Sequence, residues 1–427
     1  MMFEKYDAYK DSGVEWLAKI PANWSCIKMK FLYSDVSIKG RENAELLSVT
    51  QDRGVIPRAW VENRMVMPSG NLESFKYIQK GDFAISLRSF EGGLEYCYHD
   101  GIISPAYTVL KKKRNDLKEG YYKYLFKSKI FISELQTSIV GIREGKNISY
   151  EELRYSYLPI PSGTEQNKIS CFLDQKTSEI DQAIAIKEQQ IALLNERKQI
   201  VIQKAVTQGL DPNVLMKDSG LNGVGNIPQD WHILKFKYLA KVRYGLGQPP
   251  KQLDNGLKII RATNVERGKI VEKGMLYIDP NDIPWDRNPT LNKDEIIVVR
   301  SGAYTGDSAI VTEEYAGCIA GYDMVATPFN CDPKFLSIVL LSHYVLYEQI
   351  YLLRIRSAQP HLNAEELNEL QIVVPPINQQ RLIANYIEQV ESDIDQAISL
   401  TKRQIEKLKE YKTTLINDAV TGKIKVA

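Results

Sequence analysis

One stretch of the sequence occurs twice, and it constrains the fold more than any other feature. Residues 164–208 and residues 377–421 each run for 45 positions without a glycine or a proline. A shift of 214 positions superimposes their apolar residues, which recur at steps of three, four or seven, the spacing of one stripe along a helix. A helix of this length is about 67 Å long at 1.5 Å per residue. A globular core does not need such a length, so each apolar stripe requires a long partner, and the other copy can supply it.

The two helices are expected to run antiparallel. The first ends near Gln208, and the next globular part begins at once, near Asp211. The second helix starts from that part near Ile377, so it can cover the first helix only by running back along it. The alternative is two separate amphipathic helices, each lying on its own domain. The residues predicted to form the helix-pair seam are Ile169, Leu173, Ile180, Ile184, Ile191, Leu194, Ile383, Ile387, Ile394, Ile398, Ile405 and Leu408.

The globular parts repeat as well. The tetrapeptide KDSG at residues 10–13 returns at 217–220, and an Ile-Pro pair followed by tryptophan at 20–24 returns at 227–231. The chain therefore reads as globular part, long helix, globular part, long helix. The predicted boundaries are 1–160 for the first domain, 161–210 for the first helix, 211–374 for the second domain and 375–427 for the second helix.

Each globular part is predicted to be a mixed α/β domain with a mostly antiparallel, curved sheet. Short β-type runs such as Phe83–Leu87 and Ile296–Arg300 are broken by glycine and polar turns. Amphipathic helical periodicity marks Tyr121–Ile139 in the first part and Pro333–Leu353 in the second. The expected fold class is α+β: two mixed α/β domains joined by two long antiparallel coiled-coil helices, with a pseudo-two-fold internal repeat.

Composition narrows the class of protein without deciding its ligand. The five cysteines show no CxxC or metal-ligand spacing, which suits a reducing cytosol and neither a disulfide framework nor a zinc site. The chain has no apolar run of 18 residues and no signal-peptide pattern, so we expect a soluble, cytoplasmic protein. The net charge is +4 over residues 1–160 and −3 over residues 211–374, so neither domain has a strong basic excess and DNA binding stays open.

Corresponding loops of the two globular parts differ in their polar residues, although the scaffold repeats. Arg88 opens the loop RSFEGG after one strand, and Arg300 opens RSGAYTG after the matching strand. A polar, basic loop also precedes each long helix, at 141–149 and at 354–363. A repeated scaffold with unrepeated loop residues is the pattern expected of two copies of one reader, each tuned to a different ligand.

The segments around the start of each long helix carry a family resemblance. The run RIRSAQPHLN at 354–363, followed by EEL, VPP and QQ, resembles the end of a target-recognition domain that leads into a conserved helix. A weaker copy lies at 151–166, and the terminal DAVTGKI at 418–424 is also similar to that family. The family is that of the specificity subunits of type I restriction-modification systems, and the resemblance covers essentially the whole chain.

The resemblance implies a DNA sequence-recognition subunit that reads a bipartite target in double-stranded DNA through its two domains. It also implies docking of two modification (methyltransferase) subunits, which bind S-adenosylmethionine, and of restriction subunits, which hydrolyse ATP with Mg. The chain itself would bind no cofactor and catalyse no reaction, and its task would be to choose the site.

On this interpretation, polar loop residues contact DNA. Arginine suits guanine edges, asparagine and glutamine suit adenine edges, and lysine or arginine suits phosphates. For each residue, the alternative is an ordinary surface position or a hydrogen bond at the end of a strand. The candidate DNA-binding residues are Lys39, Gln51, Arg53, Arg88, Arg143, Lys146, Asn147, Lys251, Arg261, Asn264, Arg300, Tyr304, Arg356, Gln359 and His361.

No catalytic motif is found in the sequence. The stretch nearest to an adenine-methyltransferase loop is GQPPK at 247–251, which lacks both the polar first residue and the aromatic last one. The chain has no Walker loop, and its four histidines are scattered without forming a metal pair. We therefore predict no catalytic and no metal-binding residues. The alternative classes are a coiled-coil protein-interaction scaffold without DNA binding and, less compatible with the missing motifs, a methyltransferase fragment.

Overall fold

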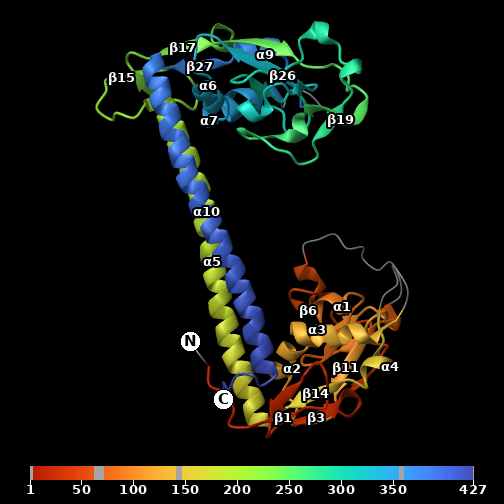
Figure 1. Ribbon diagram of the computed structural model, residues 1–427. Coiled ribbons are helices and arrows are strands. Elements are labelled where there is room, and N and C mark those ends of the chain that lie inside the picture. Colours follow the sequence, from red (N-terminus) through yellow and green to blue (C-terminus); the bar gives the residue numbers. More distant parts are fainter. Residues whose placement is uncertain (1–2, 62–71, 141–146, 355–359, 427) are drawn as a thin grey trace. The chain divides into compact units, whose positions relative to one another are not determined.

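The computed structural model describes residues 3–61, 72–140, 147–354 and 360–426, and its chain forms two compact units (Figure 1). Unit 1 comprises residues 1–187 and 402–427, and unit 2 comprises residues 188–401. Each unit therefore contains one globular part and a segment of each long helix. The sequence-based boundaries treated the helices as segments of their own, whereas here each helix is shared between the units.

The two long helices are continuous and end in the same way. Helix α5 spans Gly163–Gln208 and helix α10 spans Ile377–Val420. Gly209, directly after α5, has φ of 78°, and Gly422, two residues after α10, has φ of 72°. This left-handed conformation ends a helix at little cost only when the residue is glycine. The repeated glycine explains why both helical patterns stop where they do.

Side-chain contacts in unit 1 show that α5 and α10 run antiparallel. Lys412 on α10 forms an ion pair with Asp181 on α5 at 2.7 Å. One turn or more further along α5, Lys187 donates a hydrogen bond from Nζ to Oε1 of Gln404 at 2.6 Å. Residue numbers thus rise along one helix as they fall along the other, and the expected antiparallel pairing is confirmed.

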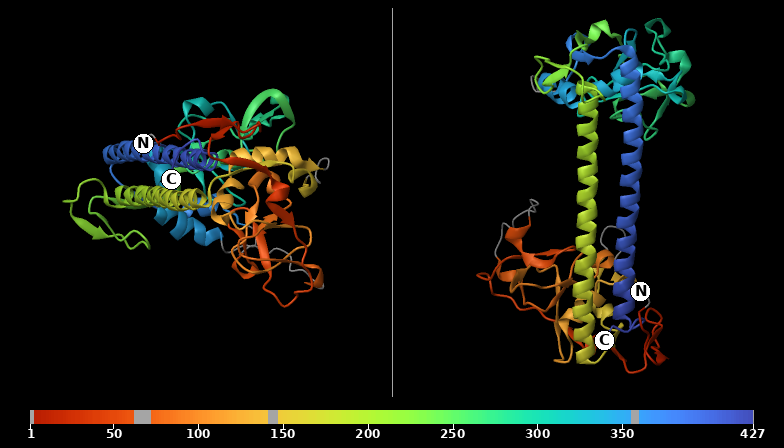
Figure 2. Two further views of the ribbon diagram at one scale, coloured as in Figure 1. Left: turned by 90° about the horizontal axis from the view of Figure 1, so that it is seen from below. Right: turned by 90° about the vertical axis from the view of Figure 1, so that its left-hand side faces the viewer.

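The same two helices lie side by side in unit 2 (Figure 2), where Lys198 on α5 forms ion pairs with Glu391 and Asp395 on α10 at 3.2 and 3.1 Å. The apolar stripe faces the partner helix or the globular part in both units. Of the residues predicted for the seam, the buried ones are Ile169, Leu173, Ile180, Ile383, Ile387, Ile394, Ile398 and Ile405, and the half-buried ones are Ile184, Ile191, Leu194 and Leu408.

A buried glutamine fixes the start of each long helix. Gln166 donates from Nε2 to the carbonyl of Pro161 at 2.9 Å and accepts the backbone N–H of Lys118 at 2.8 Å. Gln380 repeats both bonds, to the carbonyl of Pro375 at 2.8 Å and from the N–H of Asp332 at 2.8 Å. Both glutamines are at most 2% exposed, so their amides satisfy backbone groups that would otherwise be buried without partners. This is the structural reason for the glutamine that the helix-start motif contains.

Unit 1 is built around a four-stranded antiparallel sheet with the strand order β4-β11-β8-β9. Shorter two-stranded pairs surround it, and the helices α1 (Ser89–Gly92), α2 (Glu119–Leu125), α3 (Lys129–Leu135) and α4 (Tyr150–Leu153) complete the domain. The strands are β1 (Tyr9–Asp11), β2 (Lys19–Pro21), β3 (Ser25–Lys28), β4 (Tyr33–Asp35), β5 (Leu47–Thr50), β6 (Gly54–Pro57), β7 (Lys76–Ile78), β8 (Phe83–Ile85), β9 (Glu95–Tyr96), β10 (Gly101–Ile103), β11 (Thr108–Lys112), β12 (Ile139–Val140), β13 (Asn147–Ile148) and β14 (Tyr157–Ile160).

Unit 2 contains a matching antiparallel sheet with the order β18-β26-β23-β24. It adds a three-stranded sheet in which β19 and β25 pair in parallel, and its shorter helices are α6 (Pro333–Leu340), α7 (His343–Val345), α8 (Tyr351–Arg354) and α9 (Ala364–Glu369). The strands are β15 (Met216–Asp218), β16 (Asn226–Pro228), β17 (His232–Lys235), β18 (Ala240–Tyr244), β19 (Gln252–Ile260), β20 (Val265–Glu266), β21 (Lys269–Ile270), β22 (Leu276–Ile278), β23 (Ile296–Val298), β24 (Ser308–Ile310), β25 (Ile319–Ala320), β26 (Met324–Pro328) and β27 (Gln371–Val374).

The two four-stranded sheets are copies of one another. In each, a strand from early in the domain pairs with the last long strand, which in turn pairs with a hairpin. The register also repeats, because Ala84 pairs with Val109 between β8 and β11, and Ile297 pairs with Val325 between β23 and β26. The mixed α/β domains, the antiparallel sheets and the internal repeat confirm the expected α+β class.

Each globular part builds its core against the near ends of both long helices. In unit 1, Ile169 from α5 and Ala419 from α10 belong to the same buried cluster as Trp24. In unit 2, Val206 from α5 and Ile387 from α10 share a cluster with Trp231, the repeat counterpart of Trp24. Burial of this apolar surface therefore holds the helix segments and the domain together in each unit.

The two predicted amphipathic helices are broken in the structure. The stretch Tyr121–Ile139 contains the end of α2 and all of α3, separated at Ser128, whose hydroxyl accepts the N–H of Phe131 and so begins a new helix. Its counterpart Pro333–Leu353 divides into α6, α7, a short π-helical segment and α8. The apolar period is helical in both stretches, but in the first one the Ser128 cap interrupts the helix.

Within the described part of the chain, no single helix is long and apolar enough to cross a membrane. One pair, Pro333–Leu340 with His343–Leu353, has the necessary length and composition only when the two are joined across a 58° bend.

The seam predicts that substitution by aspartate destabilises the protein very differently at two apolar residues of α10. Ile398 is 9% exposed and Leu400 is 49% exposed, although they lie two positions apart. Ile398→Asp places an unpaired carboxylate in the seam and should lower the free energy of unfolding by about 3–5 kcal/mol. Leu400→Asp is the matched control and should change it by about 0.5 kcal/mol or less. Urea unfolding followed by circular dichroism measures both, and equal losses would contradict the seam.

Candidate nucleic-acid interface

Three strands of the sheet in unit 2 bring polar and aromatic residues to one edge. Strand β18 ends at Tyr244, which pairs with Met324 at the start of β26, and Met324 also pairs with Val298 at the end of β23. Because neighbouring strands are antiparallel, the residues after β23 and before β26 lie beside the end of β18. Arg300 and Tyr322 occupy these two positions.

Arg300 lies against two tyrosine rings at this edge. Its guanidinium carbon is 4.5 Å from the ring centroid of Tyr244 and 4.4 Å from that of Tyr322. Its Nη2 is 3.3 Å from Nε2 of His361, and its Nε is buried and has no hydrogen-bond partner among the described residues. Tyr244 and Tyr322 are 39% and 48% exposed. The cluster is therefore a positively charged group held between aromatic side chains at the surface of unit 2.

The loop after Arg300 carries two more of the predicted residues. Ser301 forms a β-bridge with His361, and the N–H of Gly302 donates to the carbonyl of Pro360 at 3.3 Å. Tyr304, in the same loop, is 53% exposed. The structure thus brings Arg300, Tyr304 and His361 to one region, as expected of a shared binding surface.

Asn264 corrects one sequence-based expectation. Its side chain is fully buried, and its amide nitrogen donates to the carbonyls of Val271 and Lys273 at 3.2 and 3.1 Å. Its Oδ1 accepts the backbone N–H of Arg261 at 3.3 Å. Asn264 therefore fastens its own turn and has no free edge to offer an adenine. Arg261 is half-buried and donates from Nη2 to the carbonyl of Gly274 at 2.8 Å, which also gives it a structural role.

In unit 1, the structure joins two of the predicted loops. Gln51 donates from Nε2 to the carbonyl of Arg88 at 3.2 Å, and both side chains are exposed. Arg53 donates to the carbonyl of Trp60 at 3.3 Å and lies 3.9 Å from the carboxylate of Asp52. Gln51, Arg53 and Arg88 thus belong to one exposed polar region.

Lys127 is a residue of this region that the sequence did not indicate. Its ammonium donates to the carbonyls of Gln51 and Gly92, each at 2.9 Å, and to the carboxylate of Glu95 at 2.6 Å. One lysine therefore fixes the turn after β5 to the end of α1. The Glu95 side chain is fully buried, and its Oε1 has no hydrogen-bond partner among the described atoms. Burial raises the pKa of Glu95 to about 7, although the Lys127 charge opposes the shift.

The other predicted residues that the structure describes do not gather into these clusters. Lys39 and Lys251 are exposed, and the backbone N–H of Lys251 donates to Asp282 at 2.7 Å. Asn147 lies in β13, paired with Val140. Four predicted residues lie outside the described part of the chain and are not placed: Arg143, Lys146, Arg356 and Gln359.

Strand register also corrects the alignment of the two repeats. Ala84 in unit 1 and Ile297 in unit 2 occupy equivalent positions in the two sheets. Leu87 follows Ala84 by three positions, and Arg300 follows Ile297 by three, so Arg300 corresponds to Leu87 and not to Arg88. By the same register, Tyr322 corresponds to Ala106 and Tyr244 corresponds to Ser37. The aromatic cluster around Arg300 therefore has no counterpart at this edge of the sheet in unit 1. Sequence reasoning missed Tyr244 and Tyr322, because only strand pairing brings them beside Arg300.

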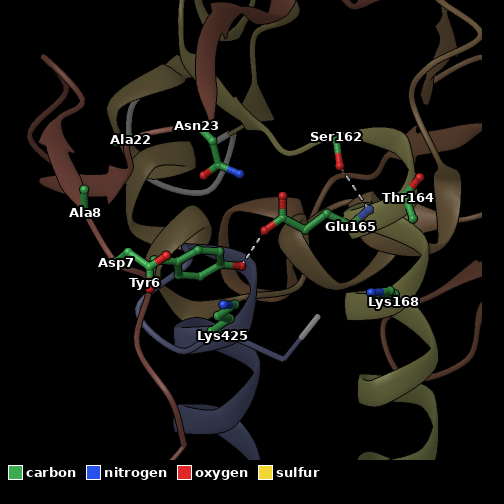
Figure 3. A pocket seen from close by; sticks show the side chains of 10 residues that line it. All are labelled: Tyr6, Asp7, Ala8, Ala22, Asn23, Ser162, Thr164, Glu165, Lys168 and Lys425. Carbon is green, nitrogen blue, oxygen red and sulfur yellow. Dashed lines mark hydrogen bonds between the residues drawn. The ribbon is translucent and has the colours of Figure 1, made fainter.

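A cleft of about 480 Å³ lies in unit 1 where the N-terminal segment, the C-terminal segment and the start of α5 meet (Figure 3). Tyr6 donates from its hydroxyl to Oε1 of Glu165 at 2.6 Å. Burial and this carboxylate raise the pKa of Tyr6 above its ordinary value. Lysines and acids both line the cleft, and the Tyr6–Glu165 bond fastens the N-terminal segment to α5. The other lining residues are Asp7, Ala8, Ala22, Asn23, Ser162, Thr164, Lys168 and Lys425.

Across the described ranges, no group of three or more His, Cys, Asp or Glu side chains is placed to hold a metal ion. The described residues at the two sheet edges include arginine, tyrosine, glutamine and histidine side chains. Such groups can donate hydrogen bonds to a ligand or pack against it.

The buried carboxyl of Glu95 predicts a pH dependence of stability. In the folded chain it keeps its proton up to about pH 7, whereas an exposed glutamate loses its proton near pH 4.5. Between these values the folded state binds more protons than the unfolded state. The contribution of Glu95 to the free energy of unfolding is therefore greatest below pH 4.5 and falls as the pH rises to 7. Glu95→Gln cannot titrate, so its free energy of unfolding relative to the natural chain should rise by up to about 3 kcal/mol over this window.

Urea unfolding of both proteins at pH 4.5 and pH 7.5 measures this change. The exposed Glu91, on α1, provides the control variant Glu91→Gln, whose difference from the natural chain should stay constant. A constant difference for Glu95→Gln as well would show that Glu95 is ionised throughout.

Comparison with known proteins gives one family. Residues 229–410 match the family profile described as the type I restriction modification DNA specificity domain. The specificity subunit of the type I restriction enzyme MjaVIII from Methanocaldococcus jannaschii is 27% identical over 341 residues, covering 76% of this chain and 75% of that subunit. The specificity subunit of the type I restriction enzyme EcoBI from Escherichia coli is 22% identical over 369 residues, covering 83% and 76%.

Solved structures share the fold. A chain solved in work on complex assembly and conformational transition of the type I R-M system aligns with a TM-score of 0.70 at 13% identity, covering 94% of this chain and 98% of that one. The HsdS subunit from Thermoanaerobacter tengcongensis aligns with a TM-score of 0.56 at 15% identity, covering 95% and 98%. The matched domain and the relatives agree: residues 229–410 carry the type I restriction modification DNA specificity domain, and over most of its length the chain is similar to specificity subunits of type I restriction enzymes.

Proposed function

We propose that the chain is the DNA-recognition subunit of a type I restriction-modification enzyme, and that unit 1 and unit 2 each read one half of a split target in double-stranded DNA. The observation that carries this proposal is the repeated sheet with unrepeated edge chemistry. At equivalent positions, unit 1 has Leu87 and Ala106 where unit 2 has Arg300 and Tyr322. Two domains of one fold with different edges are suited to two different half-sites.

The chemistry of these edges fits base recognition in the major groove. That groove presents a distinct pattern of donors and acceptors for each base pair, and arginine and glutamine can read it directly. Exposed Gln51 and Arg88 supply such groups in unit 1, and Arg300 supplies one in unit 2. The sequence-matched specificity domain supports this assignment for unit 2, where it begins at residue 229.

The chain acts as the recognition subunit and not as the catalytic one. We infer that modification subunits bind S-adenosylmethionine and methylate adenine, and that restriction subunits hydrolyse ATP with Mg, when they assemble with it. A coiled-coil interaction scaffold without DNA binding gains no support from a family defined by DNA specificity.

A second apolar stripe on the helices is suited to bind those partner subunits. In unit 2, Leu193 and Ile200 of α5 are 55% and 51% exposed and lie one heptad apart, on the same face of the helix. Leu400 of α10 is 49% exposed. Exposed apolar residues at this spacing form the seam that an additional helix can cover.

An electrophoretic shift tests the proposed function. The purified chain, alone and with its co-produced modification subunits, is mixed with duplexes of random sequence under competition at a fixed salt concentration. We expect the complex to select a split target. Binding without any sequence selection, by a complex that is fully assembled, would contradict the proposal.

If each unit reads its own half-site, recognition should be modular, and an exchange of domains tests this. Replacing residues 211–374 by the corresponding domain of a related specificity subunit should change one half of the target and leave the other half intact. The reciprocal exchange of residues 1–160 is the control and should change the opposite half. Sequencing of modified bases in the genome reads both results, and a change in both halves after a single exchange would exclude independent readers.

Partner binding should depend on the outer stripe and not on the fold. The double variant Leu193→Glu, Ile200→Glu should reduce co-purification of the modification subunits, while its free energy of unfolding stays within about 1 kcal/mol of the natural chain. Glu188→Gln together with Glu196→Gln, at exposed positions of the same helix, is the control. Undiminished assembly of the double variant would place the partner elsewhere.

A further inference from the structure

We propose that Arg300 reads a guanine in the half-site of unit 2, and that Tyr244 and Tyr322 are positioning residues that hold its guanidinium in the plane of the base pair. This inference rests on the proposed function and assigns the base that one residue recognises.

The backbone of Arg300 is fixed on both sides. Its N–H donates to Oδ1 of Asp323 at 3.2 Å, and its carbonyl accepts the N–H of Leu362 at 2.8 Å. Asp323 is 3% exposed, and it lies directly between Tyr322 and the first residue of β26. The arginine therefore leaves the sheet edge from a defined point, and little conformational freedom is left to its main chain.

The side chain is restrained as well. The guanidinium carbon lies over the rings of both Tyr244 and Tyr322, and contact with two rings at once restrains the orientation of a planar cation. Tyr244 is itself held, since its hydroxyl accepts the N–H of Ala364 at 2.9 Å. The result is an arginine that is ordered before any ligand binds, which lowers the entropic cost of recognition.

The groups of Arg300 that stay available to a ligand are the terminal nitrogens of its guanidinium. Nε is buried, so a ligand must approach the terminal Nη1 and Nη2 groups. When Nε2 of His361 carries no proton, it can accept one N–H of Nη2 across their 3.3 Å separation, which leaves the other Nη2 hydrogen and those of Nη1 for the ligand. Two parallel N–H donors match the O6 and N7 acceptors of guanine, whereas adenine presents an amino donor in place of O6.

A contact to phosphate would not need this arrangement. Phosphate oxygens accept hydrogen bonds from many directions, and flexible surface lysines and arginines serve that role. A guanidinium fixed in its plane by two rings is suited to the edge of a base, where the direction of each hydrogen bond matters. At the equivalent positions of unit 1, Ser37, Leu87 and Ala106 provide neither the cation nor the rings. The guanine is therefore assigned to the half-site of unit 2 alone.

The first test compares the modified sites of three proteins, each co-produced with its modification subunits: the natural chain, Arg300→Gln and Arg381→Gln. Arg381 is an exposed arginine of α10 in the same unit, away from the sheet edge, and serves as the matched control. We expect Arg300→Gln to lower the preference for guanine at one position of the half-site of unit 2 by about 5-fold to 150-fold, the range for one bidentate contact. Arg381→Gln should keep the natural target.

The outcomes separate this inference from the proposed function. If the natural complex modifies no defined target, the proposed function fails. If it does and Arg300→Gln keeps the same target, or loses modification equally at every sequence as expected of a phosphate contact, the inference is overturned. A change in the half-site read by unit 1 would overturn it too.

A second measurement keeps the inference testable if Arg300→Gln does not assemble. Target duplexes in which single guanines are replaced by 7-deazaguanine lack one N7 acceptor each. The natural complex should lose about tenfold affinity at one guanine of the half-site of unit 2, and Tyr322→Leu, which keeps the arginine but removes one ring, should reduce that loss. Equal affinity of the natural complex for every substituted duplex would rule out a contact between Arg300 and N7.

Discussion

The antiparallel seam between α5 and α10 is the interaction on which the rest of the structure depends. In each unit, buried isoleucine and leucine residues of both helices enter the same core as the domain's own tryptophan, Trp24 or Trp231. Each domain core thus includes residues of both helix segments, and this packing covers the inner stripe of those segments. The buried amides of Gln166 and Gln380 then fix where each helix starts. Because the cores are fixed in this way, the residues at the far edges of the sheets can differ between the two units.

The repeat keeps its scaffold while its surface chemistry diverges. Lys235 and Lys237 in unit 2 both form ion pairs with Glu369, and hydrogen bonds from the two lysines lower the pKa of that carboxyl to about 2. In unit 1, strand register puts Tyr155 where Glu369 stands, and Lys28 and Lys30 lie over its ring at 5.9 and 5.0 Å. The same divergence separates Arg300 from Leu87. A duplicated chain of this kind can change what one domain contacts without disturbing the core of the other.

The long-range order of the chain was readable from the sequence because it rests on periodicity. The 214-residue repeat, the stripe that includes Ile180 and Ile394, and the direction of the helices follow from apolar spacing and chain connectivity alone. The fine structure of the interface was not readable, because it depends on which strands pair. Asn264 is predicted to contact a base and is buried in its own turn, whereas Tyr244 and Tyr322, which no sequence motif marks, both lie over the same guanidinium, that of Arg300. Lys127 was missed for the same reason, since its three partners lie at residue 51 and at residues 92–95, both distant from it in sequence.

We propose that one chain chooses a split DNA target through two copies of one domain. A map of modified adenines, in a cell that produces the modification subunits with and without this chain, tests this proposal. A single split motif, with two different half-sites separated by unspecified base pairs, should be present with the chain and disappear without it. A motif that persists in the absence of the chain, or one continuous sequence without a spacer, would contradict the proposal.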